Sequence, residues 1–406
     1  MLATLIPFFD KDMKVCAYSL FSQKKNLLLN PTHQTSAVND GAARVEGLDI
    51  LQNIGIDTLS PDTDVFLPVG SIAVFSDIET ESKAMLGRLV LLFDNSVMNT
   101  PDYESRLREL KQKGYKLAIR KLPVKEFENY REILLLMDYI ILDHKKVDVF
   151  KAKIYFMHQY PEIKICVGNI EKQEIFDQLK EDGAFCLFEG AFYRIPVTKG
   201  QTEVEPLKVN YLELMNIVND VDFELTKAAD VIGRDTALVV SLLEMVNRTV
   251  VKSEVTSIRH AAALLGQREL KKWINTVITK ELCADRPNEI ARVSLLRAKF
   301  MECLAPAFGM GVKASELFLM GLFSVLDIIL SMPMEDALNR VNVSKDIREA
   351  LLNHKGDFAD IYDFMMAYEN ADWQEVSRIL IVRHIDNDVV YKAYIEAVCW
   401  YKELFF

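Results

Sequence analysis

Two pairs of adjacent side chains carry the clearest chemical potential in this sequence. Arg120 and Lys121 are neighbouring cations, and such a pair is suited to contact phosphate groups. Asp143 and His144 place a carboxylate beside an imidazole, the two kinds of group that most often act as general base and general acid. Consecutive side chains of a strand point to opposite faces, so we expect Asp143 and His144 to be structural.

Cysteine chemistry is a further possibility, and the spacing argues against it. The sequence contains no Cys-x-x-Cys pattern, and most of its cysteines lie within apolar runs. We therefore expect reduced, buried thiols rather than disulfides or a metal centre. The cysteines are Cys16, Cys166, Cys186, Cys283, Cys303 and Cys399.

The segments that must position Arg120, Lys121, Asp143 and His144 alternate between predicted strands and predicted helices. Short apolar runs at 88–93, 115–119, 139–142, 163–167 and 184–188 predict strands that are buried on both faces. Polar stretches at 100–113 and 171–182 predict helices, each ended by a glycine. Strand–helix–strand repetition predicts a parallel sheet or a closed barrel.

The second half loses the strands and keeps helical periodicity to the end. A polar, apolar-poor stretch at 197–206 predicts a linker. A chain of 406 residues is too long for one typical core. We therefore predict an α/β domain at 1–200 and an all-helical domain at 205–406.

Several segments then resemble known families. Residues 230–235, 242–247, 256–266 and 270–273 follow one another as the helices of an HDOD domain do. Residues 6–10 (Ile-Pro-Phe-Phe-Asp), 114–118, 138–143 and 189–196 resemble landmarks of the EAL domain. The chain thus resembles the EAL–HDOD two-domain signalling proteins. That resemblance implies a TIM-barrel-like EAL domain followed by an all-helical HDOD domain.

Active EAL domains hold two divalent metals that activate water against cyclic di-GMP, a chemistry that needs hard oxygen ligands. The resemblance implies that this sequence has replaced most of those ligands, so we expect a degenerate site with no catalytic residue, no metal and no cofactor. The former active-site positions are Ser19, Gln23, Pro68, Leu92, Asn95, Arg120, Lys121, Ile141, Gly168 and Glu189.

The change to Arg120 and Lys121 weighs most, because it puts two cations where the family has two aspartates. Two like charges about 4 Å apart repel by roughly 4 kcal/mol at an effective dielectric constant of 20. No acid lies between Gly114 and Lys125, so a shift of the alignment by one residue would not restore a carboxylate. No His-Asp dipeptide occurs either, which argues against a metal site of HD-hydrolase type in the second half.

The expected function is therefore non-enzymatic bacterial signalling in or near cyclic di-GMP circuits. In this hypothesis the barrel is a scaffold, the HDOD domain binds a protein partner, and a homo-oligomer is possible. One alternative is a nucleotide sensor that binds through Arg120 and Lys121 without hydrolysis. Residual phosphodiesterase activity and mutual masking of the two domains are further alternatives.

Charge and hydropathy indicate which partners and which cellular location to expect. The net charge is -11, with most of the acidic excess after residue 200, which argues against a nucleic-acid surface. The apolar run at 2–9 is interrupted by Pro7 and followed by charged residues, so we expect neither a signal peptide nor a membrane helix. A cytoplasmic protein without membrane contact is the expectation.

Overall fold

The computed structural model describes residues 1–23, 45, 47–60, 62–198, 206–220, 222–233, 235–249 and 255–405. The chain divides into two compact units. The barrel unit comprises Met1–Ile195, Cys303–Val312 and Asp363–Phe406, and the helical unit comprises Pro196–Glu302 and Lys313–Tyr362.

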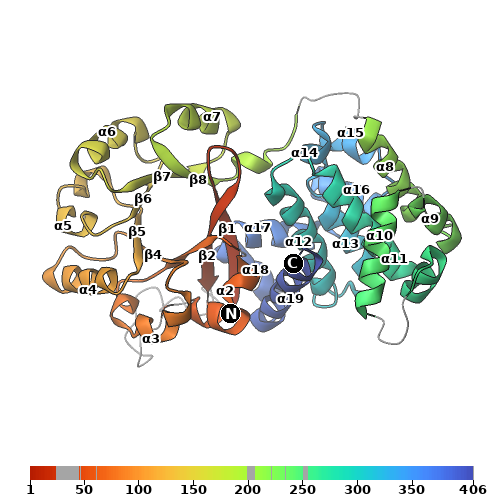
Figure 1. Cartoon of the computed structure of the whole chain (residues 1–406), viewed down its shortest axis with the longest axis horizontal. Coiled ribbons are helices and arrows are strands. Elements are labelled where there is room, and N and C mark those ends of the chain that lie inside the picture. Colours follow the sequence, from red (N-terminus) through yellow and green to blue (C-terminus); the bar gives the residue numbers. More distant parts are fainter. Residues whose placement is uncertain are drawn as a thin grey trace. The chain divides into compact units, whose positions relative to one another are not determined.

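The strands of the barrel unit close into a barrel in chain order (Figure 1). Strand β1 is antiparallel to both of its neighbours, β2 and β8, and every other adjacent pair is parallel. The predicted α/β barrel class and the predicted strands are confirmed. The strands are β1 (Leu2–Phe9), β2 (Val15–Gln23), β3 (Asp64–Pro68), β4 (Leu89–Phe93), β5 (Lys116–Arg120), β6 (Tyr139–Asp143), β7 (Lys164–Ile170) and β8 (Phe185–Gly190).

Helices connect the parallel strands and cover the outside of the barrel, as crossover connections require. Pro101 opens α4 at its first position, and Gly183 ends α7 in the left-handed region with φ 75°. The covering helices are α1 (Leu48–Ile54), α2 (Ile56–Leu59), α3 (Ile78–Ser82), α4 (Pro101–Gln112), α5 (Arg131–Leu134), α6 (Val149–Gln159) and α7 (Gln173–Asp182).

A tight turn, not a helix, joins β1 to β2. Asp10 holds this turn, because its Oδ1 accepts hydrogen bonds from the backbone N–H groups of Asp12 and Lys14 at 2.9 and 3.0 Å. A connection of this kind provides no helix to cover the outer face of the two strands. Since both faces of a barrel strand must be buried, another part of the chain has to supply the cover.

The last helices of the chain supply that cover. Helix α19 (Asn387–Phe405) contacts β1. The hydroxyl of Tyr368, at the end of α17 (Ala359–Glu369), donates to the carbonyl of Ala3 at 2.7 Å and accepts from its N–H at 3.2 Å. In α18 (Trp373–Arg383), Ser377 accepts a hydrogen bond from the amide of Gln23 at the end of β2.

The division into compact units thus differs from the predicted domains in two stretches. The sequence placed 205–406 in one helical domain, whereas Cys303–Val312 and Asp363–Phe406 belong to the barrel unit. Helical periodicity shows that one face of a helix is buried, but it does not show which element buries that face.

Between β8 and α17 the described residues form helices joined by short connections. The predicted linker at 197–206 lies mostly outside the described residues, which omit 199–205. Among the described residues, no helix has both the length and the apolar composition of a membrane-spanning segment. The helices are α8 (Pro206–Asn219), α9 (Leu225–Ile232), α10 (Thr236–Thr249), α11 (Ile258–Leu282), α12 (Asn288–Leu304), α13 (Ala314–Phe323), α14 (Leu326–Leu330), α15 (Met334–Leu338) and α16 (Lys345–Asn353).

An ion pair ties the β3–β4 connection to α4. The guanidinium of Arg106 donates to both carboxylate oxygens of Glu79 at 2.6 and 2.8 Å, and to the carbonyls of Val74 and Ser76 at 2.9 Å. The hydrogen bonds that Glu79 accepts from Arg106, with a smaller contribution from Lys113, lower its pKa to about 2, against the opposing effect of its burial. The pair therefore stabilises the fold fully above the unfolded pKa of 4.5 and loses this effect as the pH falls toward 2.

We expect Arg106→Met to lower the free energy of unfolding by about 1–2 kcal/mol at neutral pH, a value reduced for the partial exposure of the pair. The difference from wild type should shrink as the pH falls below 4.5, where Glu79 becomes protonated in the unfolded chain. Urea unfolding over this pH range measures it. Arg108→Met, at an exposed position of the same helix, is the control, and an equal loss in both variants would contradict the assignment.

Candidate functional site

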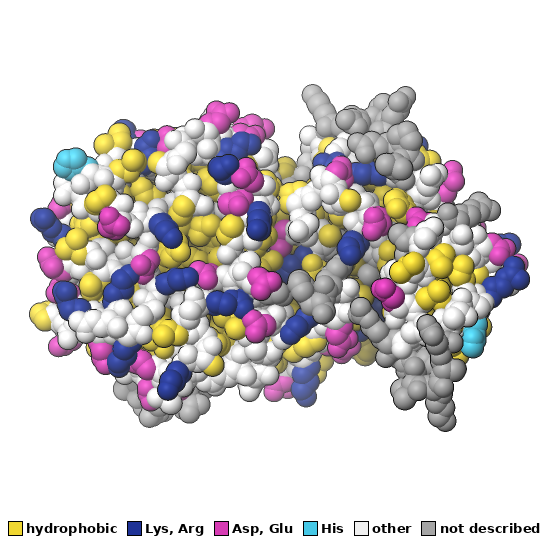
Figure 2. All heavy atoms as spheres, in the orientation of Figure 1, with side chains coloured by type: hydrophobic (Ala, Val, Ile, Leu, Met, Phe, Trp, Pro, Cys, Tyr) yellow, Lys and Arg dark blue, Asp and Glu magenta, His cyan; other side chains and the backbone are white. Residues whose placement is uncertain are grey.

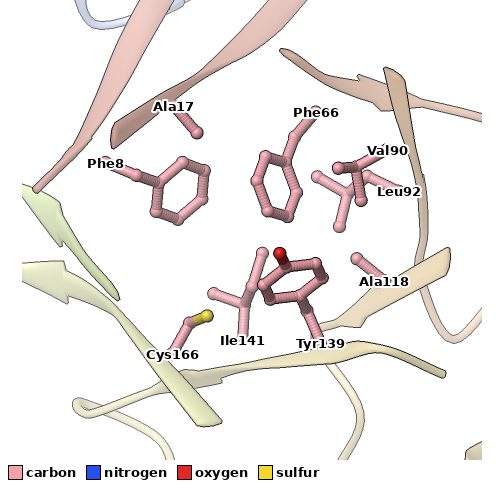
Figure 3. Close-up of a cluster of buried hydrophobic side chains, with 9 residues drawn as sticks. All are labelled: Phe8, Ala17, Phe66, Val90, Leu92, Ala118, Tyr139, Ile141 and Cys166. Atoms are coloured by element: carbon pink, nitrogen blue, oxygen red, sulfur yellow. The ribbon is translucent and has the colours of Figure 1, made fainter. Parts of the chain in front are cut away.

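Apolar side chains fill the interior of the barrel. Alternate residues of each strand point inward, and those at the middle of the barrel form one buried cluster (Figure 3). The interior is therefore a packed core and not a channel. Its members are Phe8, Ala17, Phe66, Val90, Leu92, Ala118, Tyr139, Ile141 and Cys166.

Most of the predicted site positions lie two residues beyond a member of this cluster on the same strand. Such positions also point inward, one layer nearer the carboxyl ends of the parallel strands, where enzymes of the (β/α) barrel class place their active sites. The structure thus brings these positions together as one layer, the mouth layer. It consists of Ser19, Pro68, Leu92, Arg120, Ile141 and Gly168, with Glu189 near the end of β8.

Three predicted positions lie apart from the mouth layer. Gln23 is buried at the end of β2, and its amide donates to Ser377 at 3.5 Å. Asn95 is exposed after β4, and its backbone carbonyl accepts a hydrogen bond from the hydroxyl of Tyr130 at 3.3 Å. Lys121 is exposed and has left-handed backbone geometry, with φ 58°.

An ion pair between Arg120 and Glu189 spans the mouth layer. The Nη2 atom of Arg120 lies 3.5 Å from Oε1 of Glu189, and the two side chains are 20% and 9% exposed. These residues belong to β5 and β8, which β6 and β7 separate. The guanidinium of Arg120 also lies 5.4 Å from the centre of the Phe21 ring, within the range of a cation–π interaction.

Gly168 leaves the space that this ion pair uses. A Cβ atom at this position would come within 3.2 Å of Cγ2 of Ile141 and 3.7 Å of Oε2 of Glu189. Any side chain at 168 would therefore compete with Glu189 for the mouth of the barrel.

Several polar atoms of the mouth layer are buried and have no hydrogen-bond partner in the described part of the chain. They are Nε and Nη1 of Arg120, Oε2 of Glu189 and Oγ of Ser19. Buried polar atoms of this kind are costly to leave unpaired, and a polar ligand that reached them would supply the missing hydrogen bonds.

The residues of the mouth layer do not fit a pair of divalent metals. Pro68, Leu92 and Ile141 offer only carbon atoms, and Arg120 brings a positive charge among them. A two-metal centre needs several oxygen ligands around ions that lie close together. Within the described ranges, no three His, Cys, Asp or Glu side chains are grouped as ligands of one ion.

The acids next to the mouth layer have partners of their own. The carboxylate of Asp143 accepts hydrogen bonds from the amide of Asn169 at 3.3 Å and from the N–H of Lys145 at 3.0 Å. Glu171 is paired with the ammonium of Lys145, which lowers its pKa. These contacts give both acids a role in holding the loops after β6 and β7.

The pairing of Arg120 with Glu189 was not predicted from the sequence. Its signal was present, because both residues occupy inward positions at the carboxyl ends of their strands. The closure of the barrel, which brings β5 and β8 to opposite sides of one mouth, is what turns these two positions into partners.

We expect Arg120→Met to lower the free energy of unfolding by about 2 kcal/mol, because the Glu189 carboxylate then remains buried without its partner. Adding Glu189→Gln should recover most of this loss, since no charge is then left buried. A double-mutant cycle by urea unfolding measures the coupling. Lys121→Met, at the exposed neighbouring position, is the control. Simple additivity of the Arg120 and Glu189 substitutions would contradict the ion pair.

The sequence is similar to one protein family model and to two known proteins. Residues 205–361 match the family model of the HDOD domain. The chain is 26% identical to the uncharacterized protein YuxH of Bacillus subtilis over 407 residues, covering 97% of this chain and 96% of YuxH. It is 25% identical to the cyclic di-GMP phosphodiesterase CdgJ of Vibrio cholerae over 310 residues, covering 75% of this chain and 71% of CdgJ.

Solved EAL structures overlap with the barrel part of the chain. The EAL-like domain protein YdiV aligns with a TM-score of 0.35 and 14% identity, covering 46% of this chain and 88% of YdiV.

Proposed function

Since this chain is an EAL–HDOD protein, similar to YuxH along almost its whole length, we propose that it acts in cyclic di-GMP signalling without hydrolysing the dinucleotide. The observation that supports this proposal best is the Arg120–Glu189 ion pair at the mouth of the barrel. The resemblance to EAL domains assigns Arg120 to the position of a metal-binding aspartate, and in this structure its charge is paired with an acid of the same layer.

The surroundings of the ion pair support the same proposal. The two-metal chemistry of active EAL domains needs cations held by oxygen atoms, and Leu92 and Ile141 belong to the apolar cluster instead. In this function the barrel is a rigid body that presents its surface to other molecules.

The helical unit is, in this proposal, the module that binds a protein partner. Large apolar side chains are exposed on it: Val240 is 49% and Leu264 is 50% exposed. On the face that Figure 2 shows, acidic and basic side chains are interspersed among the described residues. Mixed charge with exposed apolar side chains suits a protein partner better than a nucleic acid.

Hydrolysis of cyclic di-GMP by the full chain tests the first proposal. The protein is incubated with the dinucleotide and Mg²⁺ or Mn²⁺, and the linear product is measured by chromatography. We expect no product above that of the metal in buffer. Metal-dependent product that disappears in Glu189→Ala would overturn the proposal, because the mouth layer would then be catalytic.

A second candidate function is binding of the dinucleotide without hydrolysis. The buried Nε and Nη1 donors of Arg120, which have no partner among the described residues, favour it, since a phosphate group that reached them would supply acceptors. Calorimetry with cyclic di-GMP at tens of micromolar protein separates the two candidates. Heat that is lost in Arg120→Ala supports a sensor, and no heat from wild type leaves the scaffold function.

A further inference from the structure

Two cysteines of adjacent strands lie together inside the barrel. The Sγ atoms of Cys166 in β7 and Cys186 in β8 are 3.5 Å apart. Cys166 belongs to the apolar cluster and points into the barrel (Figure 3), and Cys186 packs against the same cluster. Both are free thiols.

A β-bulge is what brings the second thiol inward. Ile165 pairs with Phe185, whereas the next residue, Cys166, pairs with Leu187, so Cys186 is the extra residue of β8. A bulge places two consecutive side chains opposite one residue of the partner strand and redirects them. Cys186 and Leu187 therefore both pack on the interior cluster, which regular alternation would not allow.

The two thiols differ in access and in acidity. Cys166 is fully buried, and burial raises its pKa well above the ordinary value. Cys186 is partly exposed, and its pKa is lowered because the Cys166 thiol donates a hydrogen bond to its sulfur, with a further contribution from the charge of Lys164. The sulfur of the partly exposed Cys186 is thus the better nucleophile, and the buried sulfur of Cys166 lies 3.5 Å from it.

We propose that Cys166 and Cys186 form a redox-active dithiol that a low-molecular-weight disulfide oxidises to an intramolecular disulfide. The Cys186 thiolate attacks one sulfur of the small disulfide, the S–S bond of that molecule breaks, and one small thiolate leaves. Cys166 then attacks the Cys186 sulfur of the mixed disulfide and expels the second small thiolate. The two cysteine protons end on the two small thiols, and two electrons pass from the protein to the small disulfide.

The positions of the two residues suit this closure. A disulfide needs Cα atoms between about 4.4 and 6.8 Å apart and an S–S bond of about 2.05 Å. Adjacent strands are about 4.8 Å apart, and the sulfur atoms have to approach from 3.5 Å. The extra residue at the bulge is not held by regular pairing, so Cys186 is the partner that moves.

The test uses the reduced full chain, oxidised glutathione, and acid quenching followed by alkylation of the remaining thiols. Tryptic peptides 165–172 and 181–194 should appear as one cross-linked species, lighter than their sum by two hydrogen atoms. In Cys166→Ala the reaction should stop at a glutathione adduct on Cys186. In Cys186→Ser the oxidation of Cys166 should fall by about tenfold or more, because its buried thiol is protonated and screened.

Cys283→Ser is the matched control, since burial raises the pKa of this thiol to about 12 and it should take no part in the reaction. That variant should give the same cross-linked species at the wild-type rate. Circular dichroism of each variant establishes that it is folded. A stable glutathione adduct on Cys186 of the folded wild type, or no reaction at either cysteine, would overturn the proposal.

Discussion

A chain that ends at Tyr362 is expected to lose cooperative folding of the barrel unit while its helical unit stays folded. The shortened chain lacks Tyr368, and both backbone groups of Ala3 then lose their hydrogen-bond partner, at about 1–3 kcal/mol each. It also lacks the side chains that α19 buries, among them Val390 and Val398, and a valine contributes about 1.5–3 kcal/mol. The sum is comparable with the whole stability of a domain, about 5–15 kcal/mol.

The tryptophans allow the two units to be followed separately. The sequence has three, and the shortened chain keeps only Trp273, in the helical unit. Its fluorescence should still report a cooperative unfolding transition, while amide hydrogen exchange in β4 to β7 becomes fast. The full chain with Trp373→Phe and Trp400→Phe is the reference. Slow exchange in these strands of the shortened chain would show that the last helices are dispensable.

Gly190→Ala is the single substitution with the largest expected effect, a loss of about 3–5 kcal/mol from the barrel unit. Gly190 has φ 153°, a conformation that residues with a side chain rarely adopt. A Cβ atom there would overlap the backbone of Ile170, which cannot move away without breaking the end of β7. Because Glu189 is the preceding residue, the same distortion should weaken its pairing with Arg120.

Urea unfolding in a Trp273→Phe background measures this loss, since Trp373 and Trp400 both belong to the barrel unit. Gly70→Ala is the matched control. Gly70 follows β3 at the same end of the barrel, has no positive φ, and a Cβ atom there would meet nothing within 4 Å. Its effect should stay within about 0.5 kcal/mol. Equal stabilities for the two variants would contradict the close approach of β8 to β7.

The sequence predicted the barrel well because its strands are short, apolar and regularly spaced. Five strands and two of their connecting helices, α4 and α7, lie where the apolar runs and the terminal glycines placed them. Side chains alternate between the two faces of each strand, which brings Leu92, Arg120 and Ile141 into one layer. The sequence segments that resemble EAL landmarks could therefore be used to locate the mouth of the barrel.

Contacts between residues that are far apart in the chain could not be predicted from the sequence. Nothing in the local pattern of Tyr368 or α19 specifies a strand more than 360 residues away. The bulge at Cys186 was equally hidden, because a change of register depends on the partner strand and not on the residues of one strand. For the same reason the sequence placed Cys166 and Cys186 in apolar runs but did not show that they are neighbours.

The discontinuous barrel unit also has a consequence for biosynthesis. Ala3 and Tyr368 are 365 residues apart, and a ribosome adds about 5–20 residues per second, so β1 waits roughly 20–70 s for its covering helix. During that interval its apolar residues are exposed, and any compact barrel is incomplete. The helical unit, whose residues are all made earlier than α19, has time to fold first. A nascent chain whose first strand is covered by its last helices therefore depends on protection of its exposed first strands until translation ends.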